Sequence, residues 1–219
     1  MISLQYFNDV YDGGKEQMRQ SIVIKARVQD NEKMENAIFE MTESLGTVFL
    51  QEDVYFNVPQ GNLKLRIMHP NRCGQLIFNE ISKKSGHKLS ESQITEVEDV
   101  LAMRATLGAA LGERGTIRKK RRVFVLDDVR IYLDDVDEVG NFIDIAVTLK
   151  GSHDDCEKRA EDVRRKLGVD QSAVVPSAYL DLLMSQMSFD DASSVTSSSD
   201  PTDDSKSSSC ADDSDSSSS

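Results

Sequence analysis

The sequence predicts an α+β fold in which β-strands close into a barrel and amphipathic helices cover the outside of that barrel. Extended segments with alternating apolar and charged residues recur along the chain, and amphipathic helical segments separate them. A parallel α/β sheet needs a crossover helix between neighbouring strands, and such helices are missing in several places. A barrel covered by helices therefore agrees better with the order of the elements.

The first strand is predicted at Ser21–Val28. A period of two places Ile22 and Ile24 on one face of this strand and Lys25 and Arg27 on the other. The apolar face can pack against a helix, and the other face presents two cations.

A β-hairpin is predicted at Gln51–Arg66, where two extended segments flank a Pro-Gln-Gly turn that ends at Gly61. In the second arm of the hairpin, Lys64 and Arg66 point to the side opposite Leu65. The hairpin repeats the arrangement of two cations on one face.

The remaining elements follow from the same two periodicities. Further strands are predicted at Gln75–Ile81, Thr116–Leu126, Val129–Val136 and Phe142–Leu149. Helices are predicted at Asn31–Leu45, from Ser90 to about Leu107, at Ser152–Leu167 and at Pro176–Met184. A capping box of Ser90 with Gln93 supports the second helix, and residues 82–90 before it are expected to form a loop.

The charged faces of the strands allow two interpretations. Lys119 and Arg121 share a face of one later strand, and Arg130 shares a face of the next with Asp134. These faces are either solvated, as charged faces usually are, or turned into a barrel whose interior is cationic. An interior of the second kind would bind a polyanion.

Several segments resemble successive strands of the CYTH superfamily, the triphosphate tunnel proteins that include class IV adenylate cyclases and thiamine triphosphatases. They are IVIKARV, QEDVYF with GNLKLR, GTIRKKR and RIYLDDVDEVGNFIDIAV, and their order and spacing match over about residues 20–185. The resemblance implies an eight-stranded antiparallel tunnel that binds triphosphate groups and, in active members, a divalent metal. It favours the interpretation with inward cations.

Seven cations fall on positions that match the motifs of the family, and the resemblance implies that they bind phosphate. They are Lys25, Arg27, Lys64, Arg66, Lys119, Arg121 and Arg130. Ammonium and guanidinium groups form charge-assisted hydrogen bonds with phosphate oxygens. The alternative is that some of these cations only pair with Asp53, Asp134 and Asp144.

The metal-ligand positions of the family are only partly filled. Ser21 and Val23 stand where the first strand of the family typically carries glutamates, and Ala146 replaces one of two inward acidic residues on the last strand. Asp134 and Asp144 remain as candidate ligands, which predicts at most weak binding of Mg²⁺ or Mn²⁺. A further departure is Ile81, where family members commonly carry an arginine.

These residues predict a protein that binds triphosphate or polyphosphate anions with little or no turnover. One alternative is a metal-dependent triphosphate hydrolase or adenylate cyclase that uses the two remaining aspartates. A second alternative is a scaffold protein that does not bind phosphate. The motifs concern only the binding of phosphate groups. Nucleotides, thiamine triphosphate and inorganic polyphosphate all carry such groups, so the motifs do not distinguish these ligands.

Composition predicts three segments along the chain. Residues 1–19 form a poorly ordered lead-in, residues 20–187 form the tunnel domain, and residues 188–219 form a disordered acidic tail rich in Ser and Asp. The tail contributes most of the formal net charge of −12, and its serines beside aspartates resemble sites for acid-directed kinases. Such a charge balance argues against general nucleic-acid binding.

The sequence also predicts a cytoplasmic location without membrane insertion. The three cysteines form no motif or even set, and we find neither a secretory leader nor an apolar segment of about 20 residues. The three histidines fall in predicted loops or helix starts, where no neighbour at metal-ligand spacing is expected.

Overall fold

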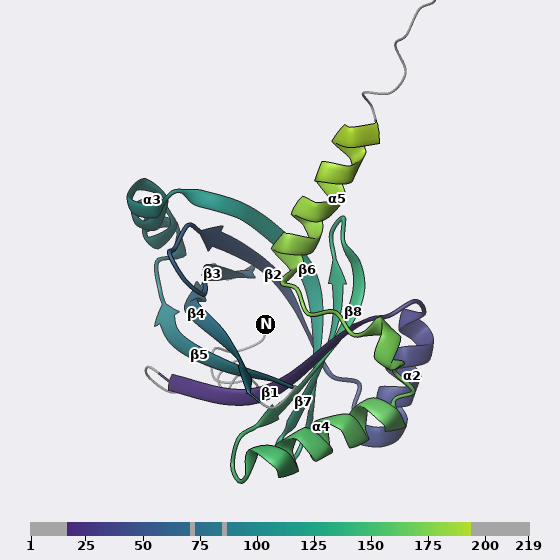
Figure 1. Cartoon of the computed structure of the whole chain (residues 1–219). Coiled ribbons are helices and arrows are strands. Elements are labelled where there is room, and N and C mark those ends of the chain that lie inside the picture. The colour runs from purple at the N-terminus through teal and green to yellow at the C-terminus, as the bar shows by residue number, and fades with distance from the viewer. Residues whose placement is uncertain (1–16, 71–72, 85–86, 194–219) are drawn as a thin grey trace, which may run out of the picture. The chain divides into compact units, whose positions relative to one another are not determined.

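A computed structural model describes residues 17–70, 73–84 and 87–193 of the chain (Figure 1). Contacts divide the chain into two units, Met1–Met184 and Ser185–Ser219, and the barrel belongs to the first. The predicted lead-in over residues 1–16 and the predicted tail over residues 194–219 lie outside the described residues.

Eight antiparallel strands close into a barrel in the order β1-β5-β4-β3-β2-β6-β7-β8, which confirms the predicted fold class (Figure 1). The strands are β1 Gln17–Arg27, β2 Thr47–Phe56, β3 Asn62–His69, β4 Cys73–Lys84, β5 His87–Val97, β6 Glu113–Leu126, β7 Val129–Val136 and β8 Gly140–Thr148. Closure leaves each strand paired on both sides, so the described barrel has no free edge. The predicted hairpin is present as β2 and β3, and Gly61 adopts the left-handed φ of +67° that its turn requires.

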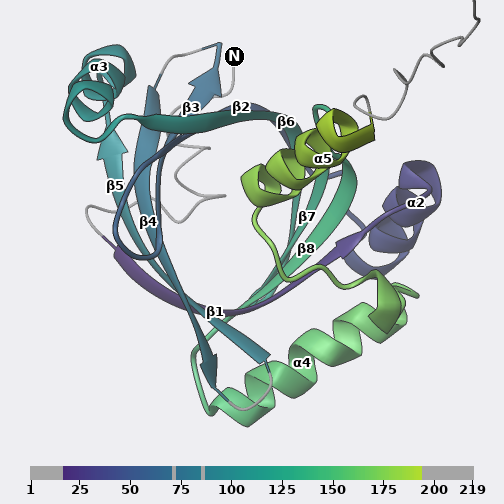
Figure 2. The same ribbon diagram turned by 45° about the horizontal axis from the view of Figure 1, so that its top comes forward.

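Four α-helices and one 3₁₀ turn accompany the barrel within the described part of the chain. They are α2 Asn31–Thr42, α3 Val100–Leu111, α4 His153–Lys166, the 3₁₀ turn η1 Gln171–Ala173 and α5 Tyr179–Ser193. In Figures 1 and 2, α4 lies across the outside of β1 and β8, while α3 lies on another side of the barrel, over β2, β3 and β4. No described helix combines the length and the apolar character that crossing a membrane requires.

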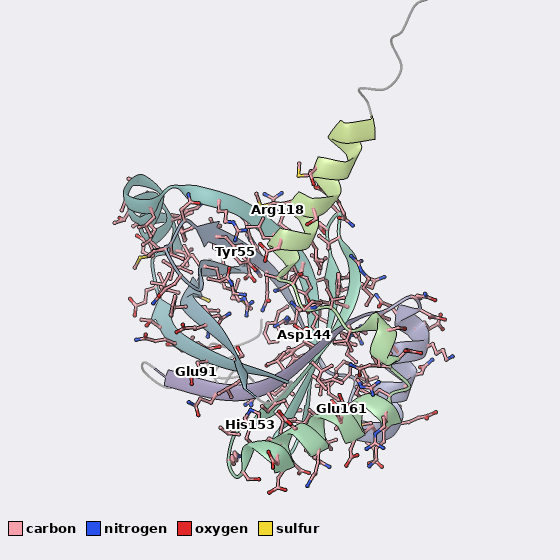
Figure 3. All side chains as sticks on the ribbon, viewed as in Figure 1. Tyr55, Glu91, Arg118, Asp144, His153 and Glu161 are labelled. Atoms are coloured by element: carbon pink, nitrogen blue, oxygen red, sulfur yellow. The ribbon has the colours of Figure 1, made fainter. Side chains whose placement is uncertain are left out.

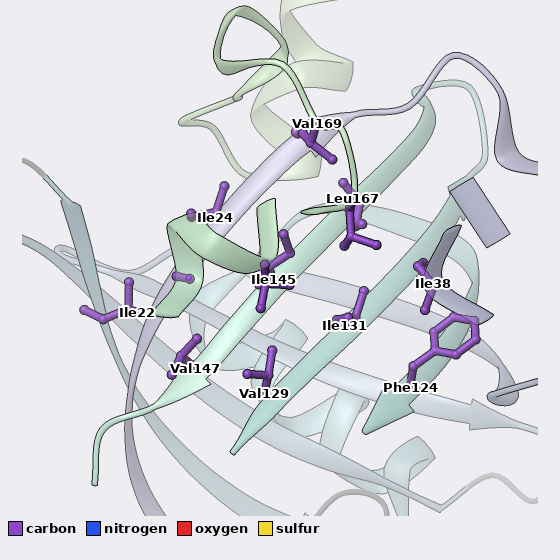
Figure 4. Close-up of a cluster of buried hydrophobic side chains, with 14 of the residues drawn as sticks. Ile22, Ile24, Ile38, Phe124, Val129, Ile131, Ile145, Val147, Leu167 and Val169 are labelled. Carbon is purple, nitrogen blue, oxygen red and sulfur yellow. The ribbon is translucent and has the colours of Figure 1, made fainter. Parts of the chain in front are cut away.

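The apolar faces of the strands point outward and are buried under helices. Figure 4 shows the largest cluster, in which Ile24, Ile131 and Ile145 of the barrel wall are close to Leu167, which follows α4, and to Ile38 of α2. A second cluster lies under α3. Because the helices take up the apolar faces, the charged faces of the same strands must face the interior of the barrel.

One predicted helix is wrong over its first half. Residues 87–97 form β5, which pairs with β1 and β4, and α3 begins only at Val100 with Asp99 as its N-cap. The segment also alternates with a period of two, since Leu89 and Val97 are buried on the outer face. Barrel closure needs a strand between β1 and β4, and this tertiary requirement overrides the local capping signal. Of the loop predicted at residues 82–90, residues 82–84 belong to β4 and residues 87–90 to β5, and residues 85–86 lie outside the described residues.

Other boundaries shift by a few residues. β1 begins at Gln17, within the predicted lead-in, and α5 extends to Ser193, so residues 188–193 of the predicted tail are helical. The first helix ends at Thr42 rather than Leu45, because Glu43 takes the left-handed cap conformation.

After α4 the chain returns along β1 and reaches one end of the barrel. Val174 forms an isolated bridge with Ala26, and the Val175 amide donates a hydrogen bond to the Lys25 carbonyl over 2.8 Å. This return segment, residues 170–178, places Tyr179 in an apolar cluster with Phe142 at the end of the barrel. The return segment and the start of α5 therefore cover part of the interior.

Candidate functional site

A cavity of about 520 Å³ lies in the barrel and is also lined by Glu161 of α4 and by the return segment. Its lining includes four of the seven cations predicted to bind phosphate: Lys25, Lys64, Lys119 and Arg121. They come from three strands, β1, β3 and β6, whose inward positions the period of two selects. Figure 3 labels Tyr55 and Asp144, which also line the cavity, and Arg118, Glu91 and His153, which do not. The fold thus brings most of the predicted cations together.

Asp53 of β2 holds three of the predicted cations. It is fully buried and accepts two hydrogen bonds from the Arg66 guanidinium, from Nε over 2.7 Å and from Nη2 over 2.9 Å. Its Oδ2 also accepts from Lys64 Nζ at 3.1 Å and from Lys119 Nζ at 3.0 Å. Burial alone would raise the pKa of Asp53, but Arg66, Lys119 and Lys64 hold that pKa well below its ordinary value. The carboxylate therefore stays charged.

Burial has the opposite consequence for the two lysines. It lowers the pKa of Lys64 to about 8, although Asp53 partly opposes the shift. It also lowers the pKa of Lys119 well below the ordinary value, again against the attraction of Asp53. One carboxylate thus compensates two lysines and an arginine incompletely, and an added anion would favour the charged form of both lysines.

Arg121 joins the two candidate metal ligands. Its Nε and Nη2 donate to the two oxygens of Asp134 over 2.7 and 2.5 Å, and Nη2 reaches Asp144 Oδ2 at 3.3 Å. The Tyr179 hydroxyl donates to Asp134 Oδ2 over 2.9 Å. Burial would raise the pKa of Asp134, but Arg121 lowers it to about 2. Both oxygens of Asp134 are consequently engaged by protein groups.

Only part of a metal site is available in this arrangement. Asp144 Oδ1 is buried and has no hydrogen-bond partner among the described residues. Val23 and Ala146, where the resemblance leads us to expect carboxylates, face each other directly in the β1–β8 ladder and offer no ligand atom. The donors therefore fit one Mg²⁺ or Mn²⁺ ion that takes most of its ligands from phosphate and water, and do not fit two ions.

The other three predicted cations do not line this cavity. Arg66 is buried and paired with Asp53, as described above. Arg27 is exposed near the end of β1, where its Nη1 donates to the Val139 carbonyl over 3.0 Å. Arg130 is half-buried on β7, in register with Ala146 of β8 and Val125 of β6. These positions divide the predicted set into a central group and a flanking group.

Sequence reasoning did not assign Tyr179 to the site. Its ring lies under two cations, with Lys25 Nζ 3.9 Å and Lys119 Nζ 5.2 Å from the ring centroid. The only signal in the sequence was an aromatic residue inside a short apolar helix. The position of Tyr179 depends on the path of the return segment, and no periodic pattern in the sequence predicts that path.

A second group of potential ligands lies on α4, outside the barrel. His153, Asp154 and Glu157 bring ligand atoms within 4.8 Å of one another, and His153 Nδ1 lies 3.1 Å from Glu157 Oε1. The expectation that the histidines have no neighbour at ligand spacing is therefore wrong for His153. None of these residues lines the cavity.

The fold and the site define a class of protein: closed antiparallel β-barrels whose interior carries a cluster of cations. The sequence model of the CYTH domain matches residues 19–179, which is more than half of the chain. The chain belongs to the CYTH domain family.

Several solved structures share this fold. A protein from Pyrococcus horikoshii OT3 is 27% identical with a TM-score of 0.66, over 74% of this chain and 99% of that one. A putative adenylate cyclase from Vibrio parahaemolyticus is 16% identical with a TM-score of 0.62, over 77% and 99% of the two chains. A putative adenylyl cyclase from Hippeastrum, described as having a dominant triphosphatase activity, is 13% identical with a TM-score of 0.56, over 77% and 96%. The comparison with curated proteins gives no match.

Proposed function

We propose that the chain binds triphosphate or polyphosphate anions in the interior of its barrel and turns them over slowly or not at all. The observation that carries this proposal is the group of four cations, Lys25, Lys64, Lys119 and Arg121, around one cavity of about 520 Å³. Membership of the CYTH family supports the choice of triphosphate as the anion.

The ion pairs within the barrel agree with a binding role. Lys64 and Lys119 share a single oxygen of Asp53, and burial lowers the pKa of both lysines. Phosphate oxygens placed among these ammonium groups supply the negative charge that Asp53 alone does not. Binding of a polyanion therefore stabilises the charged lysines.

Slow turnover follows from the metal-ligand positions. Phosphoryl transfer with two metals uses ions that stabilise both the attacking and the leaving oxygen. Here Arg121 takes both oxygens of Asp134, and of the two candidate carboxylates only Asp144 has an oxygen, Oδ1, without a hydrogen-bond partner among the described residues. When a single Mg²⁺ or Mn²⁺ ion is bound, it screens charge on the phosphates, and the residues of this chain position the phosphates.

The available Asp144 oxygen also supports a second candidate function, a metal-dependent triphosphate hydrolase. In that case Asp144 would position the metal, and Arg121 would contact the transferred phosphoryl group. A scaffold that does not bind phosphate remains the third possibility.

Two measurements on the full chain separate the three functions. Calorimetry with tripolyphosphate, with and without Mg²⁺, should show binding in both conditions, and an absence of heat in both would leave only the scaffold. A phosphate-release assay at saturating tripolyphosphate should then show little product. Rapid, Mg²⁺-dependent release would instead establish the hydrolase.

A further inference from the structure

Helix α3, on the outside of the barrel, has an outer face without charge. The residues that it exposes are Leu101, Ala102, Ala105, Thr106, Ala109, Ala110 and Leu111. The Thr106 hydroxyl donates to the Ala102 carbonyl over 2.9 Å, so its polar group is used within the helix. Arg104, the charged residue of α3, binds Glu113 and Glu52 instead of covering this face.

Helix α4 has the opposite kind of outer face. Its exposed residues are all charged: Asp154, Asp155, Lys158, Asp162, Arg165 and Lys166. Both helices bury a second face against the barrel, and on α3 this face includes Val100, Met103 and Leu107. A helix that is apolar all round is normally buried on all sides. The described part of the chain nevertheless leaves the outer face of α3 open, and Leu101 on that face is 53% exposed.

Residues 1–16, which lie outside the described residues, are attached to the barrel close to α3. Gln17 pairs with Ile94 in the antiparallel β1–β5 ladder, so the chain before Gln17 leads toward the end of β5 that precedes α3. β5 ends at Val97, and α3 begins at Val100. A short tether of this kind can raise the effective concentration of a segment near its docking surface to about millimolar.

The sequence of this segment complements the outer face of α3. Leu4, Phe7 and Tyr11 recur at positions i, i+3 and i+7, which places them on one face of a helix. Alanines recur on α3 at the same spacing, at residues 102, 105 and 109. Large side chains on one helix pack into the spaces between small ones on another. At 1.5 Å per residue, a helix over residues 2–12 is about 16 Å long and α3 is about 18 Å long.

A second copy of the chain fits this face less well. With a length of about 18 Å and a diameter of about 10 Å, α3 offers a surface of at most a few hundred Å². A stable dimer buries roughly 800 Å² on each partner. The segment of the same chain needs no such area, because its tether already keeps it nearby.

We propose that residues 2–12 form an amphipathic helix that packs along the outer face of α3, with Phe7 against Ala105. Gly13 and Gly14 let the chain turn between this helix and β1. Residues 13–16 together reach about 13 Å when extended, which allows for the step from the docked helix to Gln17. The proposal concerns the outside of the barrel and replaces the expectation of a poorly ordered lead-in for these residues.

Hydrogen exchange of the full chain, followed by mass spectrometry, tests the contact. In the parent, the amides of residues 2–12 should exchange about tenfold or more slowly than in a free peptide of the same sequence. Phe7→Asp and Ala105→Asp should each remove this protection, because either change puts a carboxylate into an apolar contact. Gln5→Asp lies on the opposite face of the proposed helix, and this matched control should keep the protection.

The barrel provides an internal check on folding. Ala105 is exposed, so the amides of β7 and β8 should stay protected in all three variants. Free-peptide exchange of residues 2–12 in the parent, or protection that survives Ala105→Asp, would refute the proposal. A parent that sediments as a dimer, becomes a monomer in Ala105→Asp and leaves residues 2–12 unprotected would assign the face to a second copy and also refute it. None of these results depends on whether the barrel binds phosphate.

Discussion

The barrel interior has two sides that differ in charge although the same strand geometry builds them. Strands β1, β3 and β6 present Lys25, Lys64, Lys119 and Arg121 to the cavity, while β4 and β5 present only neutral residues, such as Asn79. Both sides alternate with a period of two, and helices cover part of the outer face of each. The fold therefore supplies the barrel, and the inward side chains alone set the charge of each side.

The largest expected effect comes from restoring ligands on the charged side. Val23→Glu with Ala146→Glu places two carboxylates opposite each other in the β1–β8 ladder, beside Asp144. If missing metal ligands limit turnover, Mg²⁺-dependent phosphate release should increase by about 100-fold or more, because two metal ions can then bind. Each single variant should do less. A double variant that still binds tripolyphosphate but stays as inactive as the parent would refute this explanation.

The next effect is on the free energy of unfolding, and it compares a variant on the charged side of the barrel interior with one on the uncharged side. Asp53→Asn leaves Arg66 and two lysines buried without their carboxylate, which should lower the free energy of unfolding by roughly 3–5 kcal/mol. Asn79→Leu removes a side-chain oxygen that has no hydrogen-bond partner among the described residues, so it should change that free energy by about 1 kcal/mol at most. Urea unfolding of both variants measures the difference. Equal losses would mean that the ion pairs do not stabilise the charged side.

A smaller effect is expected for single cations, and β6 provides its own control. Lys119 points into the cavity, and the neighbouring Lys120 is exposed on the outer face. Lys119→Ala should weaken tripolyphosphate binding by about 1–3 kcal/mol, the range for a hydrogen bond to a charged group. Lys120→Ala should leave it nearly unchanged. Similar affinities for the two variants in calorimetry would show that the anion binds elsewhere.

The smallest effect is a pH dependence of binding. Burial lowers the pKa of Lys64 to about 8, and a bound anion favours its protonated form, so tripolyphosphate affinity should fall severalfold as the pH rises from 7 to 9. Lys64→Arg stays charged and should show a weaker fall. The stability of the free protein should change with pH in the opposite direction to the binding affinity. Between pH 8 and 10.5 the unfolded chain holds the Lys64 proton more tightly, so this residue makes the folded state more stable as the pH rises. An affinity that is flat over this range, in parent and variant alike, would exclude Lys64 from the site.

Much of this arrangement could be predicted from the sequence, because alternation and helical periodicity reflect the faces that each element buries. These patterns identified seven of the eight strands, and the resemblance placed the central cations. β5 was missed because Ser90 and Gln93 imitate a helix start, and only barrel closure shows that the segment must be a strand. The grouping of three cations on Asp53 depends on the register of β2 against β3 and β6, which no single segment encodes.

The place of β1 in the barrel also affects how the chain folds. β1 is the first strand described, yet its neighbours are β5 and β8, so its ladder to β8 joins residues more than a hundred positions apart. Contacts so distant along the chain form late, because a long segment must be ordered before they can stabilise it. During synthesis β1 leaves the ribosome well before β8, and until β8 follows, at least one of its edges can pair with other chains. The same closure that removes every free edge from the finished barrel thus leaves the growing chain exposed to aggregation until its last strand is made.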